Sequence, residues 1–134
     1  MRRIVANFFI SLDGVVEAPH EWHFPYYSEE MGQAVAAGAA TATAFLFGRR
    51  GFDDWAGVWP HRDAADPFTA FINSVEKVVL THRPDDVPDW NNTTVVSADF
   101  TDRLRQLKAD GDGDITMSGS ATTVRWLLDH ALLD

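Results

Sequence analysis

Two glycine-containing turns are the first candidates for chemistry, because each follows a short apolar run and has residue types that bind anions. Gly48-Arg49-Arg50 follows the run 42–47, and Gly119-Ser120-Ala121 follows the run 114–118. Glycine lets a backbone approach a phosphate, helix-start N–H groups attract the anion, and arginine adds charge-assisted hydrogen bonds. A solvated turn explains the first segment equally well, and Ser120 can serve simply as an N-cap. Neither turn has the glycine pattern of a dinucleotide fingerprint or a P-loop.

Two further polar segments also follow apolar runs. In Thr81-His82-Arg83, the arginine is suited to contact a nucleotide phosphate or to pack over an adenine, and an exposed polar strand end is an equally good account. Asp13, in Ser11-Leu12-Asp13-Gly14, is the candidate for hydrogen-bonding a substrate or helping in proton transfer. An ordinary Asp-Gly turn is the alternative for Asp13.

The segment 22–27 has an unusual amount of aromatic surface for a loop. It reads Trp-His-Phe-Pro-Tyr-Tyr, and its rings at Trp22, Phe24, Tyr26 and Tyr27 are candidates for a substrate wall. The same rings can equally pack over a sheet edge or into a dimer. His20 and His23 have the spacing of metal ligands, but no distant third ligand accompanies them, so we predict no metal site.

Composition limits the classes of function. The 134 residues are enough for one domain, which we expect to span 1–134, and the net charge of −9 argues against general nucleic-acid binding. The chain has no cysteine, which excludes disulfides and thiolate chemistry. No apolar run approaches the roughly 20 residues that a membrane helix needs, and the N-terminus is unlike a signal peptide. These features predict a cytoplasmic protein without a membrane partner.

Short apolar runs alternate with helical patterns along the whole chain. We expect strands at 4–10, 42–47, 77–81, 93–97 and 114–118, and helices at 28–41, 66–73, 99–109 and 120–131, with a short helix or turn at 52–55. This alternation predicts an α/β domain with a mostly parallel sheet, and the first run reads as a strand buried on both faces. Because parallel strands end at one edge, Asp13, Gly48, Arg83 and Gly119 are predicted to meet in one crevice.

The last helix raises the question of what covers it. Val124, Leu127, Leu128 and Leu132 form an apolar stripe, and the sequence ends at Asp134. We expect that further C-terminal strands are missing, or that a partner subunit covers the stripe in a homodimer. The alternative is that the helix packs on its own sheet.

Four segments, taken in order, resemble the reductase domain of the bacterial bifunctional deaminase-reductase of riboflavin biosynthesis, a domain similar in fold to dihydrofolate reductase. They are Ser-Leu-Asp-Gly at 11–14, Phe-Leu-Phe-Gly-Arg-Arg-Gly-Phe at 45–52, Val-Val-Leu-Thr-His-Arg at 78–83, and the strand and helix at 114–128. The stretch 15–22 looks most like the small stand-alone members of this family. The resemblance implies a three-layer dihydrofolate reductase-like fold with the usual C-terminal strands absent.

The resemblance also implies a function. It implies an NADPH-dependent reductase that transfers a hydride to a small planar heterocyclic or sugar-linked molecule, as 5-amino-6-(5-phosphoribosylamino)uracil reductase does. Residues 48–50 would sit near the cofactor phosphates, 81–83 would line the adenosine side, 119–121 would meet the pyrophosphate, and Asp13 with the 22–27 loop would face the substrate. Gly51 replaces the family's usual threonine, and the turn at 118–120 has only one glycine. The glycine-poor turn and the absent C-terminal strands favour the alternative, a non-catalytic nucleotide-binding or dimerisation module.

Overall fold

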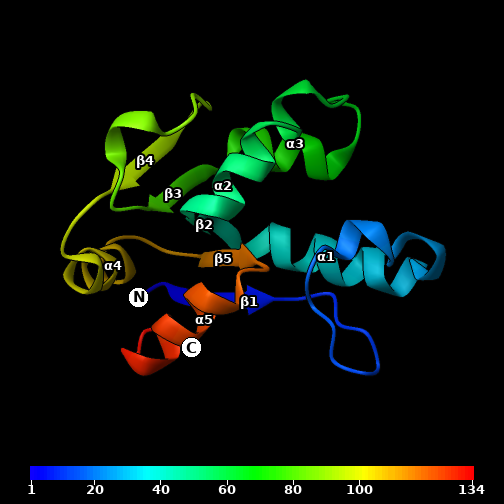
Figure 1. The fold of residues 1–134 in the computed structure, drawn as a ribbon, viewed down its shortest axis with the longest axis horizontal. Coiled ribbons are helices and arrows are strands. Elements are labelled where there is room, and N and C mark those ends of the chain that lie inside the picture. Colours follow the sequence, from blue (N-terminus) through cyan, green and yellow to red (C-terminus); the bar gives the residue numbers. More distant parts are fainter.

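Five short apolar runs form one parallel sheet in the structure, a computed structural model that describes residues 1–134 (Figure 1). The strands are β1 (Arg3–Asn7), β2 (Ala42–Gly48), β3 (Glu76–Leu80), β4 (Thr93–Val96) and β5 (Asp114–Ser118). Their order across the sheet is β1-β5-β2-β3-β4, and every neighbouring pair is parallel. The predicted α/β class and parallel sheet are therefore confirmed.

The first strand differs from its prediction in length and in place. β1 ends at Asn7 and lies at the edge of the sheet, so the expectation of a strand to Ile10 buried on both faces is wrong. The apolar run continues because Phe8 and Ile10 leave the sheet to line a hollow with Val124 of the last helix. Alternation and apolarity alone do not distinguish these two uses of a hydrophobic residue.

Five α-helices connect or follow the strands, and four single 3-10 turns lie in the loops. The helices are α1 (Glu29–Thr41), α2 (Arg49–Ala56), α3 (Pro67–Ser74), α4 (Phe100–Ala109) and α5 (Ala121–Asp129), and the 3-10 turns are η1 (Pro19–Glu21), η2 (Phe24–Tyr26), η3 (Trp59–His61) and η4 (Pro84–Asp86). Helix α2 begins directly after Gly48, so Arg49 and Arg50 are helical residues rather than the turn that the sequence predicted before 52–55.

N-cap side chains stabilise the first turn of three of these helices. The side chain of Ser28 accepts a hydrogen bond from the N–H of Met31 at α1. Asp66 caps α3 in the same way, with Pro67 at the first helical position. Ser120 caps α5 by accepting from the N–H of Thr123. Each cap satisfies an N–H group that has no partner within its helix, which fixes where the helix starts.

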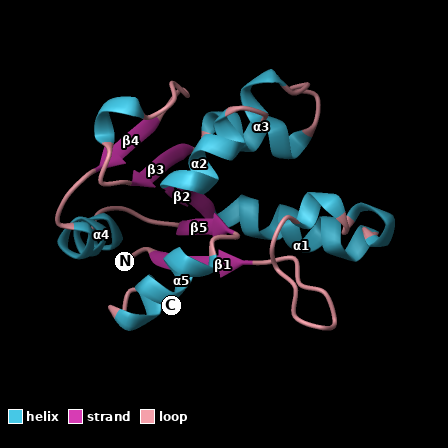
Figure 2. Ribbon diagram, viewed as in Figure 1, coloured by secondary structure: helices cyan, strands magenta, loops and turns pink.

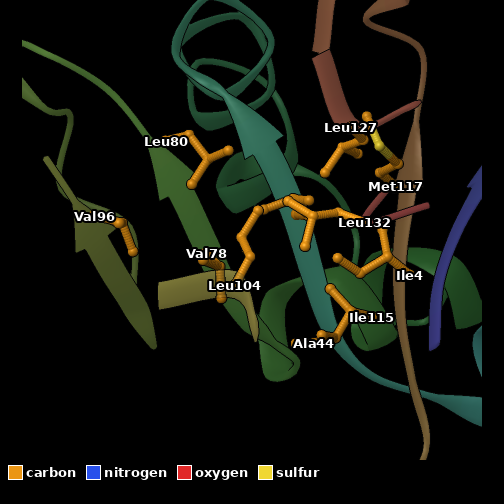
Figure 3. Close-up of a cluster of buried hydrophobic side chains, with 11 residues drawn as sticks. Ile4, Ala44, Val78, Leu80, Val96, Leu104, Ile115, Met117, Leu127 and Leu132 are labelled. Carbon is orange, nitrogen blue, oxygen red and sulfur yellow. The ribbon is translucent and has the colours of Figure 1, made fainter. Parts of the chain in front are cut away.

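Two hydrophobic cores lie on opposite faces of the sheet and make three layers (Figure 2). Helices α4 and α5 cover an aliphatic core on one face, which Figure 3 shows as a continuous layer of side chains. Helices α2 and α3 cover a core rich in phenylalanine and tryptophan on the other face. Helix α1 contacts α3 and β5, so it belongs to this second layer. No residue of α1 is buried.

The apolar stripe of the last helix packs mostly on its own sheet. Leu127 and Leu132 are fully buried in the aliphatic core, and Val124 packs against it. Leu128 remains 59% exposed. This arrangement agrees with the alternative in which α5 covers its own sheet. None of the helices is both long and apolar enough to cross a membrane.

Candidate functional site

The parallel sheet brings the predicted turns to one edge. Asn7 at the end of β1 pairs with Ser118 at the end of β5, and Gly48 at the end of β2 pairs with Leu80 of β3. The segments that follow these strands therefore all leave from the carboxyl edge, which is the edge where open α/β sheets bind ligands. Helices α2 and α5 start at this edge and leave it on opposite faces of the sheet (Figure 1).

The turns after β2 and β5 touch each other at Gly48. A Cβ atom on this residue would lie 2.7 Å from Oγ1 of Thr123 and 3.5 Å from Oγ of Ser120. The φ of Gly48 is −75°, so it is the close approach and not the backbone conformation that favours glycine here. The two anion-binding candidates from the sequence thus form one site rather than two.

The turn between β5 and α5 presents an open backbone. Gly119 and Ser120 both have left-handed conformations, with φ of 72° and 58°. The N–H of Gly119 donates to the carbonyl of Asn7, which ties this turn to the end of β1. A Cβ on Gly119 would have no atom within 4 Å. The first N–H groups of α5, starting at Ala121, have no partner within the helix, so this open turn is suited to an anion.

Arg49 does not reach into open space; protein groups surround its guanidinium. Its Nε donates to Asp53 at 2.7 Å, and its Nη1 donates to a carboxylate oxygen of Asp86 and to the carbonyl of Arg83, both at 2.7 Å. Its Nη2 donates to the carbonyl of Asp86. The side chain of Arg49 is only 12% exposed. The hydrogen bonds that Arg49 donates to Asp86 and then to Asp53 raise the pKa of Arg49.

The other predicted cofactor-binding residues after β2 and β3 differ in how exposed they are. Arg50 is exposed and forms no ion pair, and the side chain of Arg83 is 69% exposed with Asp86 at 3.9 Å as its ion-pair partner. Thr81 is buried, and its hydroxyl accepts a hydrogen bond from the N–H of Arg83. The ring of His82 packs on Phe100 of α4 with their centroids 4.7 Å apart. The carboxyl edge therefore has two exposed arginine side chains, Arg50 and Arg83, and the imidazole ring of His82, which packs on Phe100.

Asp13 belongs to a self-contained turn. Its carboxylate accepts a hydrogen bond from the hydroxyl of Ser11 at 2.6 Å, and the N–H of Val15 donates to the same hydroxyl. Gly14 completes the turn with a φ of 91°. Asp13 is exposed, and the segment that holds it leaves the sheet at the candidate edge. The catalytic role stays a prediction.

The aromatic rings of the 22–27 loop gather around a histidine. His23 is buried, and its ring lies 4.5 Å from that of Phe9 and 4.2 Å from that of Phe24. Its Nδ1 donates to the carbonyl of Pro19. Part of the aromatic surface is thus used to build the loop. Tyr26 is 77% exposed, and Tyr27, Trp22 and Phe24 keep exposed surface as well, so a substrate wall stays a prediction.

Two residues of this region were not singled out from the sequence. Asp53 had a local signal, because a carboxylate four residues after Arg49 is the spacing of a helical ion pair. Asp86 had none, since its partner at 49 is distant in the chain. The His, Asp and Glu side chains form no group that could hold a metal ion.

Comparisons with known proteins place the chain in a family. Residues 2–134 match the family described as the RibD C-terminal domain. The structure resembles a protein from Shewanella sp. PV-4 whose name assigns it to riboflavin biosynthesis, with a TM-score of 0.62 and 18% identity over 100% of this chain and 73% of that one. It also resembles dihydrofolate reductase from Enterococcus faecalis in complex with NADP(H) and RAB-propyl.

The second likeness has a TM-score of 0.59 and 15% identity over 95% of this chain and 64% of that one. At these identities the two structures show the fold, which is the predicted dihydrofolate reductase-like fold. No curated protein sequence matches the chain.

Proposed function

The chain belongs to the RibD C-terminal domain family, a family of reductase domains, and on that premise we propose that it is an NADPH-dependent reductase of a small planar heterocyclic or sugar-linked substrate. The observation that carries the proposal is the contact between the two turns at Gly48 and Thr123. It joins an open helix start to the arginine-bearing start of a second helix. Together they offer backbone N–H groups and the exposed guanidinium of Arg50 to one phosphate-rich ligand.

The residues at this edge fit such a cofactor in separate parts. The turn at 119–121 suits a pyrophosphate, since a Cβ on Gly119 would have no atom within 4 Å and the first N–H groups of α5 have no partner within the helix. Thr81, His82 and Arg83 line the adenosine side in this proposal, and Arg50 extends the positive charge beside them. When bound, the cofactor supplies a hydride from C4 of its nicotinamide, and the protein's task is to orient it and exclude competing reactions.

The substrate side is assigned to the segment after β1. In this proposal, exposed rings of Trp22, Phe24, Tyr26 and Tyr27 bind a planar substrate by stacking. Asp13, held by Ser11, orients a water or the substrate for protonation. An Asp13→Asn variant keeps the hydrogen bond acceptor and removes the charge, so its turnover at saturating cofactor tests the role.

A titration separates this function from its alternative. The fluorescence of NADPH is followed as protein is added, and its oxidation is followed by absorbance with candidate pyrimidine and pteridine substrates. Binding with turnover supports the reductase. If NADPH binds and none of the substrates is turned over, the result supports a non-catalytic nucleotide-binding module. The exposure of Asp13 favours this alternative. Absence of binding contradicts both functions.

We also propose that the protein is a cytoplasmic homodimer, with β1 or α5 near the interface. Exposed apolar side chains support this, among them Leu128 on α5 and Ile10 after β1. Sedimentation at low micromolar concentration tests it. A compact monomer of 14.9 kDa there would contradict the dimer.

A further inference from the structure

Arg49 has almost no hydrogen-bonding capacity left for a ligand. A guanidinium has five N–H groups, and four hydrogen bonds to Asp53, Asp86 and the carbonyls of 83 and 86 occupy most of them. Recognition of a phosphate by a pair of parallel N–H groups needs a free fork. Two carboxylates also balance the charge of Arg49. The arginine directly after Gly48 is therefore committed to the protein itself.

The hydrogen bonds of Arg49 connect two elements that are distant in the chain. Arg49 is the first residue of α2, and two of its hydrogen bonds are donated to main-chain carbonyls of the segment 83–86, which includes η4. One of them fixes the carbonyl of Arg83, the residue whose own side chain is largely exposed beside the site. Removing Arg49 would free this segment and displace Arg83 with it.

We propose that Arg49 is a positioning residue that clamps the segment 83–86 to the start of α2, and that Arg83 and Arg50 distinguish NADPH from NADH by binding the 2′-phosphate. This inference rests on the proposed function for the identity of the ligand, but the clamp itself does not. The two arginines after Gly48 thus have different roles. Arg49 fixes the position of the segment 83–86, and Arg50, together with Arg83, supplies positive charge to the 2′-phosphate.

Asp86 opposes that charge and is a second determinant of specificity. It pairs with Arg49 and lies 3.9 Å from Arg83, so it reduces the positive potential where the 2′-phosphate would bind. The hydrogen bond from Arg49 lowers the pKa of Asp86, which favours the charged form of this carboxylate. Asp86→Asn keeps an oxygen that can accept from Arg49 and removes the charge. We expect it to bind NADPH about two- to fivefold more tightly and NADH unchanged.

The test compares Arg49→Ala, Arg49→Lys, Arg83→Ala and, as an exposed control arginine on α4, Arg105→Ala. NADPH and NADH are titrated against each, and amide hydrogen exchange is measured over 81–88 without ligand. We expect Arg49→Ala to speed exchange at 83–87 and, because Arg83 is displaced, to weaken NADPH more than NADH, with partial recovery of both in Arg49→Lys. We expect Arg83→Ala to weaken NADPH by about ten- to a hundredfold, with NADH and exchange nearly unchanged. Arg105→Ala should leave all three measurements as in the wild type.

Two results would overturn the inference. Selective loss of NADPH in Arg49→Ala with unchanged exchange would show that Arg49 reads the phosphate directly. Equal weakening of both dinucleotides in Arg83→Ala would remove the role of Arg83. If the wild type binds neither dinucleotide, the proposed function fails and the specificity assignment fails with it. Exchange then still decides the clamp, which faster exchange at 83–87 in Arg49→Ala supports and unchanged exchange contradicts.

Discussion

The two edges of the sheet differ in whether their cationic side chains are hydrogen-bonded within the fold or exposed. At the amino edge, Lys77 is fully buried and its ammonium donates to the carbonyls of Ile72 and Val75 at the end of α3, although Nε of the buried Arg2 has no hydrogen-bond partner. At the carboxyl edge, polar groups are left open, as at the start of α5 and at the exposed side chains of Arg50 and Arg83. The buried cation at the amino edge is therefore used within the fold, whereas the exposed polar groups at the carboxyl edge are available to a ligand.

This difference indicates what a substitution should affect at each edge. A group that the fold satisfies contributes to the free energy of unfolding, and its removal leaves partners unpaired. A group that faces open space contributes little to folding and can contribute to binding. We therefore expect changes at the amino edge to alter stability alone, and changes at the carboxyl edge to alter nucleotide affinity.

Lys77→Ala is expected to have the largest effect. It removes a fully buried side chain, leaves two carbonyls of the α3 end without their donor, and removes a cation 4.8 Å from the centre of the Trp90 ring. A loss of about 2–5 kcal/mol in the free energy of unfolding should follow. Urea unfolding measures it, and Lys77→Met, which refills the space, should lose less. A change in NADPH affinity in a folded variant would break the division between the edges.

The pH dependence of stability should reveal the same lysine. Burial lowers the pKa of Lys77 from 10.5 to about 8. Between these values the unfolded chain binds a proton that the folded chain does not, so this residue makes the free energy of unfolding increase as the pH rises from about 8 to about 10.5. The increase is at most about 3.4 kcal/mol. Urea unfolding across this range should show it in the wild type relative to Lys77→Met, and equal slopes would contradict a neutral buried lysine.

Gly48→Ala tests the carboxyl edge. The new Cβ would lie 2.7 Å from Oγ1 of Thr123, so the side chain of Thr123 must rotate or the two turns must separate. We expect the affinity for both dinucleotides to fall about tenfold, which is about 1.4 kcal/mol.

Gly51→Ala, one turn further along α2 with no atom near its Cβ, is the matched control for Gly48→Ala. It should leave affinity unchanged and stabilise the helix by about 0.5–1 kcal/mol. A Thr123→Ala background should restore affinity to Gly48→Ala. If it does not, the contact between the turns is not what Gly48 protects.

Much of the fold was predictable because its signals are local. The strand at 114–118 has the predicted bounds, and Ser28, Asp66 and Ser120 cap the helices that their sequence positions indicated. The order of the strands was not predictable, because it depends on which faces pack together. For the same reason the edge position of β1 was missed: an apolar run reads alike whether its residues meet a sheet or a neighbouring helix.

The candidate site was predictable in place but not in detail. Parallel strands share a carboxyl edge, and that rule alone brings the turns at Gly48 and Gly119 together. The partners of Arg49 were not predictable, because Asp86 lies 37 residues away and comes close only through the packing of β3 beside β2. His23 was set aside as a metal ligand, and its role in organising the aromatic loop depends on Phe9, which lies in a different segment.

The smallest effects are expected from alanine substitutions of one glycine at each edge of the sheet. Gly119 at the carboxyl edge and Gly111 near the amino edge have φ of 72° and 95°, and neither would bring a Cβ into a clash. Alanine at either position should cost about 1 kcal/mol of stability through left-handed strain alone. Only Gly119→Ala should also weaken NADPH binding, because relief of the strain shifts the N–H groups of the β5–α5 turn. Matched thermal unfolding and NADPH titration of both variants measure this, and equal affinities would show that the turn does not contact the nucleotide.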